Sequence, residues 1–308
     1  MPARALGLLL GYTADRAWGD PRRLHPVAGF GSAAIYLETL TYRDSRSSGL
    51  AHVLLCVGVT TGLSVVAERT ARNPLVRTAL TAAVTWTVLG GRSLEREADA
   101  VHRLLAAGDL APARTRLRSL VGRETTTLGP GEIARAVVES VAENTSDAVV
   151  ASLLWGAVAG IPGLVAHRAA NTLDAMIGHR NARYGRFGWA AARLDDALGL
   201  PASRLSGVLV AAAGPDPVGA LAAWRCDARR HPSPNAGVVE AAFAGALGLQ
   251  LGGTNTYGGS RREDRALMGH GRAPASADIP RATRLARRVG VGAILAAVAF
   301  CLAREMRK

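Results

Sequence analysis

The sequence is almost without lysine, and this limits how it could use a nucleotide. Of its 37 Lys and Arg residues, only the last residue, Lys308, is a lysine. A P-loop of the form GxxxxGK[ST] is therefore absent, and no dinucleotide-binding GxGxxG, GxSxG, HExxH or EF-hand pattern occurs. Any use of ATP must rely on arginines and on phosphates held by a metal ion.

Cysteine and aromatic residues are also scarce. The three cysteines, Cys56, Cys226 and Cys301, are far apart and form no CxxC pair, so neither a structural zinc site nor a disulfide framework is indicated. Only 5% of residues are aromatic, and the net charge of +13 comes from arginines spread over every polar segment without a nucleic-acid motif. We therefore expect no nucleic-acid partner, because arginine beside apolar segments is typical of a cytoplasmic membrane face.

Long runs without charge are the main feature of the sequence. Residues 148–167 and 50–67 contain no Asp, Glu, Lys or Arg, and residues 78–91 and 289–303 form shorter runs. As a helix, the longest run spans roughly 30 Å, the thickness of a bilayer core. With 49% hydrophobic residues and 35 glycines, the composition favours an all-α, polytopic membrane protein. The alternative, a soluble protein with buried core helices, is consistent with the mean hydropathy of +0.14.

The chain is predicted to form one integral membrane domain over residues 1–308, in the cell (inner) membrane, with polar connecting loops. Residues 92–130 are charged, and their apolar positions follow helical spacing, which predicts an insert of two amphipathic helices broken near "GDLAP", outside the bilayer or on its surface. Dense turn signals predict a polar connector over residues 12–49 and a Gly/Arg-rich loop over residues 253–288. The N-terminal stretch is predicted to be a retained first helix.

Three carboxylates stand four positions apart in "ESVAENTSD", directly before the longest apolar run. On a helix, Glu139, Glu143 and Asp147 fall within about an 80° arc, and Asn144 lies beside it. Like charges at this spacing repel one another, so the row needs water, arginine or a cation bound through carboxylate oxygens. We predict a metal site, because charged groups at membrane depth are usually functional; the alternative is a solvated face outside the membrane.

A second polar segment, "NTLDAMIGHRNARYGRFGWAAARLDD", mixes several kinds of binding group. Arginine suits phosphate and carboxylate ligands, and adjacent aspartates suit Mg²⁺. A solvated basic loop would explain the arginines, but it would not explain the interleaved Asn, Asp and Tyr. The candidate residues are Asn171, Asp174, Arg180, Asn181, Arg183, Tyr184, Arg193, Asp195 and Asp196.

Two proline-containing motifs could also face a ligand. "HPSPNAG" offers His231, Ser233 and Asn235 from a backbone that two prolines restrict. The alternative is a rigid turn before a helix that starts at residue 236, with Ser233 or Asn235 as its cap. "GDPRRLHP" offers Asp20 and His25 in a similar setting, and "LGGTNTYGG" is a further Gly-rich loop.

Taken in order, "GDPRRLHPV", "ESVAENTSDAVVASLLW", "NTLDAMIGHRNARYGRFGWAAARLDD", "HPSPNAG" and "LGGTNTYGG" resemble the CobD/CbiB family of cobalamin biosynthesis. The likeness runs from about residue 6 to residue 300, and the blocks at 171–196 and 231–237 are its most specific part. Two positions depart from the pattern: Ser152 stands where the family has Pro, and the residues directly before His25 are "RRL", without a Pro.

The resemblance implies a membrane-embedded ligase, adenosylcobinamide-phosphate synthase. Such an enzyme condenses adenosylcobyric acid with (R)-1-aminopropan-2-ol O-phosphate, or with free aminopropanol, and forms an amide on a corrin side chain. ATP and Mg²⁺ are the expected cofactors, the corrin would approach from the cytoplasmic side, and a homo-oligomer or helper protein is left open. The alternative is a non-enzymatic transporter or an AmpE-like signalling protein of the same fold, although the paired broken helices of a transporter are not apparent.

Amide formation requires an activated carboxylate, and this requirement assigns roles to the candidate residues. Arginines would neutralise phosphates, asparagines would orient the substrate, and a base would take the amine proton. The predicted catalytic residues are Glu143, Asp174 and His231. The predicted metal ligands are either Glu139, Glu143 and Asp147 or Asp174, Asp195 and Asp196. The predicted substrate- and phosphate-binding residues are Asn144, Asn171, Arg180, Asn181, Arg183, Tyr184, Arg193, Ser233, Asn235, Asp20 and His25.

Overall fold

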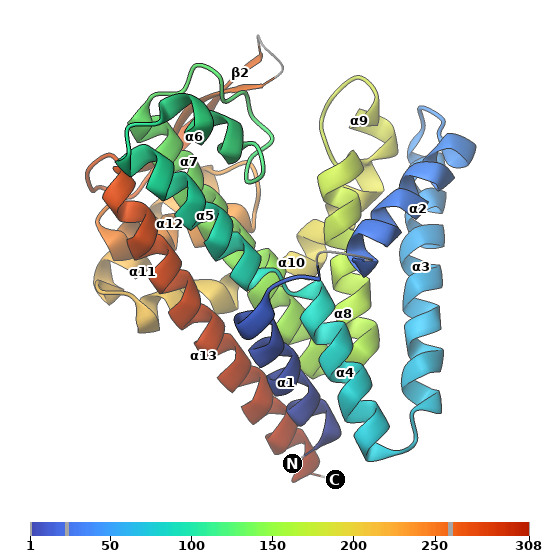
Figure 1. Ribbon diagram of the computed structural model, residues 1–308. Helices are drawn as coiled ribbons and strands as arrows, with labels where there is room; N and C mark the ends of the chain where they lie inside the picture. The colour runs from blue at the N-terminus through green and yellow to red at the C-terminus, as the bar shows by residue number, and fades with distance from the viewer. Residues whose placement is uncertain (1, 22–24, 258–260, 308) are drawn as a thin grey trace. The chain divides into compact units, whose positions relative to one another are not determined.

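The computed structural model of the chain describes residues 2–21, 25–257 and 261–307 (Figure 1). Nearly all of its regular structure is helical, so the all-α prediction is confirmed. The chain divides into two compact units, each with its own internal packing. Unit 1 comprises Met1–Gly90, Asp147–Gly199 and Ala293–Lys308, and unit 2 comprises Gly91–Ser146 and Leu200–Gly292.

Unit 1 is a helical bundle in which α4 packs against α1 and α8, and α3 packs against α8. The apolar core between α2, α3, α8 and α9 is centred on Phe187, which is fully buried. The elements of unit 1 are α1 (Ala3–Trp18), α2 (Pro26–Thr41), α3 (Arg46–Thr70), α4 (Pro74–Val88), most of the π-helix η1 (Thr145–Ala151), α8 (Ser152–Ile177), α9 (Tyr184–Phe187), the first part of α10 (Trp189–Ala213) and the end of α13 (Ile279–Glu305).

Unit 2 packs α7 against α5, α6 and α12, and α12 lies against α11. A two-stranded antiparallel sheet, β1–β2, adds to it, with a bulge between Leu251 and Gly253. The elements of unit 2 are α5 (Gly91–Ala106), α6 (Leu110–Leu117), α7 (Pro130–Asn144), the rest of α10, α11 (Pro217–Asp227), the 3-10 helix η2 (Ala228–Arg230), α12 (Ala236–Leu247), β1 (Leu251–Tyr257), β2 (Arg261–Met268), the 3-10 helix η3 (Ser276–Asp278) and the start of α13.

Three helical stretches are long and apolar enough to cross a membrane: Arg46–Thr70, Pro130–Ile177 and Ser276–Glu305. The first two contain the predicted runs, so the expectation of several spanning helices is confirmed. Only 22% of the most apolar window of α3 is buried within the chain. Side chains such as Leu54 and Leu63 therefore point outward, as a lipid-facing helix requires.

Glycines let α1 approach α4 closely. Gly7 and Gly11 form a GxxxG pair on α1, and a side chain at Gly7 would stand 2.5 Å from Thr81 Cβ. Gly11 faces Thr85 in the same way. Small residues commonly line helix contacts in lipid. Lipid tails are as apolar as leucine, so helices there associate through close packing and not through the hydrophobic effect.

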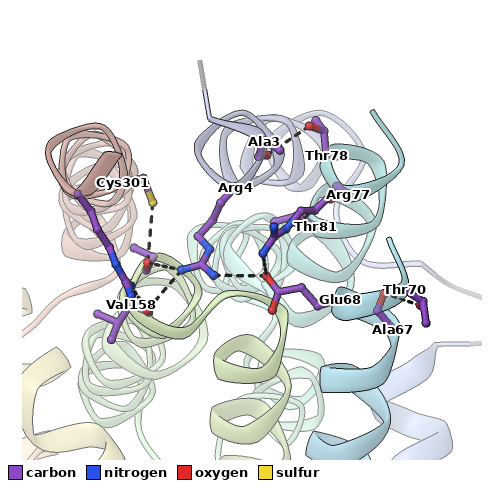
Figure 2. Close-up of polar contacts among 12 residues, drawn as sticks. Ala3, Arg4, Ala67, Glu68, Thr70, Arg77, Thr78, Thr81, Val158 and Cys301 are labelled. Atoms are coloured by element: carbon purple, nitrogen blue, oxygen red, sulfur yellow. Dashed lines mark hydrogen bonds and ion pairs between the residues drawn. The ribbon is translucent and has the colours of Figure 1, made fainter. Parts of the chain in front are cut away.

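The spanning helix α8 changes direction at Gly160, where φ is 72° and ψ is −148°. Pro162 has no N–H, so the carbonyl of Val158, four residues earlier, lacks its helical donor. Arg304 Nη1 donates to this carbonyl at 2.9 Å, and Arg4 Nη1 approaches it at 3.4 Å. Figure 2 shows Arg4, from the start of the chain, beside Val158 at the broken turn. The two arginines thus supply donors to a carbonyl that has lost its helical partner.

The structure corrects two boundary predictions and supports a third. Residues 12–49 are not a connector, because Pro26 occupies the first turn of α2 and His25 caps this helix, so the "HP" signal marks a helix start. The predicted loop over 253–288 instead contains the hairpin, η3 and the start of α13. The insert forms α5 and α6 with a break between them, as predicted, and its place relative to a bilayer stays a prediction.

Replacing Gly160 should destabilise unit 1. In Gly160→Ala the new Cβ would stand 2.6 Å from Glu68 Oε1 and 2.7 Å from Arg4 Nη2, at a left-handed φ. We expect the free energy of unfolding to fall by about 2 kcal/mol, seen as a lower melting temperature in detergent. Gly62→Ala is the matched control, because nothing lies within 4 Å of its added Cβ. Equal melting temperatures would contradict this account of the kink.

Candidate active site

Glu139 lies in the interior of unit 2, where α7 packs against α12, and only 4% of it is exposed. Its Oε2 accepts a hydrogen bond from Arg123 Nη2 at 2.6 Å, and its Oε1 accepts one from the Gly252 N–H at 2.9 Å. Arg135 Nε stands 3.9 Å from Oε1. A buried carboxylate needs such partners. Since both oxygens have them, Glu139 organises this region, and its metal role stays a prediction.

A pocket of about 120 Å³ adjoins Glu139 within unit 2. Glu143 lines it from one turn further along α7, and Arg265 lines it from β2. The volume admits a few water molecules, a phosphate group or a hydrated cation, but not a corrin ring. Two carboxylates and two arginines therefore meet at a space that fits only the reacting ends of large substrates. The lining residues are Leu120, Val121, Gly122, Arg123, Ala136, Glu139, Ser140, Glu143 and Arg265.

Glu240 is a fully buried carboxylate on α12 that the sequence analysis did not single out. His231 Nε2 stands 3.6 Å from its Oε1. His231 Nδ1 lies 3.0 Å from the Ser233 amide nitrogen and 3.2 Å from the Ser233 carbonyl oxygen, so the turn at Ser233 holds the ring. Burial, and then the nearby carboxylates Glu139 and Glu143, raise the pKa of Glu240 well above 4.5. The Ser233 backbone thus orients His231, whose Nε2 lies near Glu240, and the role of His231 as a base stays a prediction.

The turn before α12 confirms the rigid-cap alternative for Ser233. Its Oγ accepts from the N–H groups of Asn235 and Ala236, at 3.3 and 3.2 Å. Asn235 Oδ1 accepts from Ser203 Oγ and from Arg204 Nη1, each at 3.0 Å. These side chains hold the loop that presents His231, and direct contact with substrate stays a prediction for them.

The π-helix η1 begins where the row of carboxylates meets the apolar run. Asn144 is the last residue of α7, and its Nδ2 donates to the Ser140 carbonyl at 2.9 Å. The boundary between the two units falls within η1, so Glu139 and Glu143 belong to unit 2 and Asp147 to unit 1. Each π turn adds one residue, which shifts Asp147 from the position that a continuous α-helix predicts.

Unit 1 holds a second acidic set. Asp174 on α8 lies near enough to Asp196 on α10 for the two carboxylates to repel each other. Arg193 Nη1 stands 3.6 Å from Asp196 Oδ2, and Arg180 also attracts this carboxylate. Burial raises the pKa of Asp196, against the effect of both arginines. Asn171 and Asp195 lie half-buried on the same two helices, α8 and α10.

Two other predicted acidic residues meet at an arginine inside unit 1. Asp20, after α1, and Asp147, in η1, both act electrostatically on Arg168 of α8. The structure thus brings together residues that are far apart in sequence. His25 is not part of this group, because its Nδ1 accepts from the Val27 N–H at 3.2 Å and caps α2.

Arg183 and Tyr184 are held by a residue that the sequence analysis missed. Arg183 donates to Glu38 Oε1 from Nη2 at 2.8 Å, and Tyr184 OH donates to the same oxygen at 3.1 Å. The Arg183 guanidinium also lies 4.3 Å from the ring centre of Tyr42. Asn181 Oδ1 accepts from the Tyr184 N–H and starts α9. These contacts fasten the α8–α10 connection to α2, and substrate contact by these residues stays a prediction.

No preformed metal site is present among the side chains that the structure describes, since no three of His, Cys, Asp and Glu are arranged to hold one. Mg²⁺ needs only one or two protein carboxylates when phosphates and water complete its shell. Two places offer such carboxylates: Glu143 at the pocket of unit 2, and Asp174 with Asp196 in unit 1. The donor chemistry fits Mg²⁺ in either place.

Three helical stretches long and apolar enough to cross a membrane, together with buried pairs of carboxylate and arginine, define a class of protein, a polytopic helical membrane protein. Comparison identifies the family. The model of the CobD/Cbib protein family matches residues 8–286. The chain therefore belongs to the CobD/CbiB family, a family of cobalamin biosynthesis proteins.

Curated relatives are similar in sequence to this chain over most of their length. A protein of Mycobacterium tuberculosis (strain CDC 1551 / Oshkosh) named "Cobalamin biosynthesis protein CobD" is 50% identical over 299 residues, covering 96% of this chain and 95% of its own. A protein of the same name from Geobacter metallireducens is 46% identical, and the match covers 80% of each chain. Another, from Rhodobacter capsulatus, is 39% identical, and the match covers 91% of this chain and 92% of its own. No solved structure matches significantly.

The raised pKa of Glu240 predicts a pH-dependent stability. In the unfolded chain Glu240 loses its proton near pH 4.5, whereas in the folded chain it keeps the proton to a higher pH. Between these two pKa values, the free energy of unfolding should therefore fall as the pH rises. The expected slope approaches about 1.4 kcal/mol per pH unit. Glu240→Gln cannot ionise and should lack this pH-dependent loss of stability. The melting temperature of the variant minus that of the wild type should therefore increase with pH.

The matched control is Glu97→Gln on α5, whose side chain pairs with Arg116 near the surface. Surface pairs contribute at most about 1 kcal/mol, so this variant should follow the wild type at all pH values. A constant difference between the wild type and Glu240→Gln from about pH 4 to about pH 8 would show that Glu240 ionises normally.

Proposed function

We propose that this chain is an amide ligase of cobalamin biosynthesis. It condenses adenosylcobyric acid with (R)-1-aminopropan-2-ol O-phosphate, or with free aminopropanol, and uses ATP and Mg²⁺. The product with the phosphorylated amine is adenosylcobinamide phosphate. Membership of the CobD/CbiB family supports the pathway, and the charged pocket of unit 2 supports the reaction type.

The observation that carries the proposal is the composition of that pocket. Glu143 and the arginines Arg123 and Arg265 line a small space next to the buried Glu139. A ligase of this kind must hold several negative groups at once: the corrin carboxylate and the phosphates of its substrates. Guanidinium groups are the side chains best suited to both. The corrin ring itself would stay outside, because the pocket takes only a side chain's end.

The proposed reaction has two steps. A carboxylate oxygen of the corrin side chain attacks the terminal phosphorus of ATP, which breaks the bond to ADP and gives an acyl phosphate. The amine nitrogen then attacks the acyl carbon, loses a proton and expels inorganic phosphate. Arg123 and Arg265 would balance the charge on the phosphate oxygens. Glu143 would accept the amine proton, since it is the carboxylate of the pocket that is only half-buried.

Mg²⁺, when bound, would reduce the negative charge of the ATP phosphates. Glu143 is one candidate to hold it, and Asp174 with Asp196 in unit 1 is the other. The arginines near the second pair, Arg180 and Arg193, would contact phosphates there. We place the active site on the cytoplasmic side, where ATP is available.

Single substitutions test whether the reaction needs each of the two acidic groups. Glu143→Gln and Asp174→Asn keep size and remove charge, and we expect each to lower the rate of amide formation by about 100-fold or more. The measurement uses the full-length chain in lipid nanodiscs with adenosylcobyric acid, the amine phosphate, ATP and Mg²⁺, and quantifies the corrinoid product by mass spectrometry.

Each variant has a control that makes the same chemical change elsewhere in its unit. Glu97→Gln serves unit 2, and Asp44→Asn, at an exposed pair with Arg186, serves unit 1. Both should keep the wild-type rate within about twofold. Loss in only one of the two test variants would locate the acidic group that the reaction needs. Near-normal rates in both would remove the proposed roles of Glu143 and Asp174.

A further inference from the structure

A second pocket is lined by residues of unit 1 alone, and none of them is assigned to the reaction. Its volume is about 420 Å³, and four of its lining residues are Arg4, Arg72, Arg77 and Arg304. We call it the arginine pocket. Its residues come from the first turn of α1, the α3–α4 connection, α4, α8 and the last turn of α13. Ends of several helices thus meet where no catalytic residue was predicted.

Internal contacts hold three of the four guanidinium groups in place (Figure 2). Arg4 donates to Glu68 Oε1 at 3.3 Å and to the Ala157 carbonyl at 3.2 Å. Arg77 donates to the same Glu68 oxygen at 2.9 Å, and Arg304 donates to the carbonyl of the broken turn of α8. A guanidinium has five N–H donors, so these contacts orient each group while leaving donors for a ligand.

The arginine pocket carries an excess of positive charge. Four arginines face two carboxylates, Glu68 and Glu305, which gives a formal balance of four minus two, or +2. Glu68 is largely buried, with 11% of its side chain exposed, and it is already shared between Arg4 and Arg77. Arg72 is exposed at the rim. An anion with several oxygens would complete the balance, and phosphate matches the forked donors of arginine.

The surroundings indicate where such an anion would come from. Two candidate membrane spans end at this pocket: α3 at Thr70 and α13 at Glu305. Ends of spanning helices lie at the depth of lipid headgroups. Next to Arg72 and Arg77, Leu75 is 78% exposed and Val76 is 54% exposed, so apolar surface continues directly from the basic rim. Acyl chains could cover that surface while a headgroup fills the pocket.

We propose that the arginine pocket binds a phosphate group, and that an anionic membrane lipid supplies it. The phosphate oxygens accept hydrogen bonds from Arg72, Arg77 and Arg304, and the acyl chains lie against Leu75 and Val76. A bound lipid would fasten the ends of α1, α3, α4 and α13 to one another. The proposal is independent of the amide ligase reaction, because no residue of this pocket is assigned to it.

Binding is tested on the full-length chain in detergent micelles by native mass spectrometry. Three probes are titrated: dioleoylphosphatidylglycerol, dioleoylphosphatidylcholine and inorganic phosphate. We expect phosphatidylglycerol to bind the wild type more tightly than the zwitterionic lipid. In Arg72→Gln/Arg304→Gln its affinity should fall by about tenfold or more, because two charge-assisted contacts are lost.

The control is Arg43→Gln, which removes an exposed arginine just before the other end of α3. It should bind phosphatidylglycerol as the wild type does. Because Arg304 also supports α8, Arg72→Gln alone is measured too, and its affinity should fall about threefold. Unchanged affinity in both pocket variants, or an equal loss in Arg43→Gln, would overturn the proposal. Equal, pocket-dependent binding of inorganic phosphate would support a phosphate site but overturn the lipid as its source.

Discussion

Within each unit, a carboxylate buried among apolar helices is held by an arginine from another segment of the chain. Glu139 pairs with Arg123 in unit 2, and Glu68 pairs with Arg4 in unit 1. An unpaired buried charge would cost about 3–5 kcal/mol, so these pairs constrain how the helices pack. Arg4 also reaches a backbone carbonyl, which a guanidinium can do at the same time. The compact ammonium group of lysine lacks this planar fork of donors.

Periodicity and charge predict the fold well where a segment is uniform. The two longest apolar runs lie in spanning helices, and the amphipathic insert breaks where its "GDLAP" signal stands. The prediction is wrong where one type of residue is common in two kinds of structure. Pro26 is both a turn former and a good first residue of a helix, and here it begins α2. Local pattern does not predict the hairpin, because its strands pack against helices that are distant in sequence, such as α7 and α11.

For the candidate site, the sequence predicts the kinds of residue but not their partners. Glu143 and Asp174 were found because carboxylates at membrane depth stand out in an apolar chain. Glu240 is a single carboxylate in an apolar helix and belongs to no recognisable motif. Glu38 lies in the segment for which the turn signals predict a connector. The partners of Glu139 come from distant segments, and only the folded chain shows that Arg123 and the Gly252 N–H occupy its oxygens.

The function we propose is that of a membrane ligase, in which arginines and carboxylates would bind the charged ends of substrates whose bulk stays outside. The family assignment supports the pathway, and the pocket of unit 2 supports the chemistry. The most direct measurement is growth of a cobalamin-dependent strain from which the gene for this chain is deleted. The account predicts that cobinamide restores growth and cobyric acid does not. Growth on cobyric acid alone would contradict it, because the amide would then be formed without this chain.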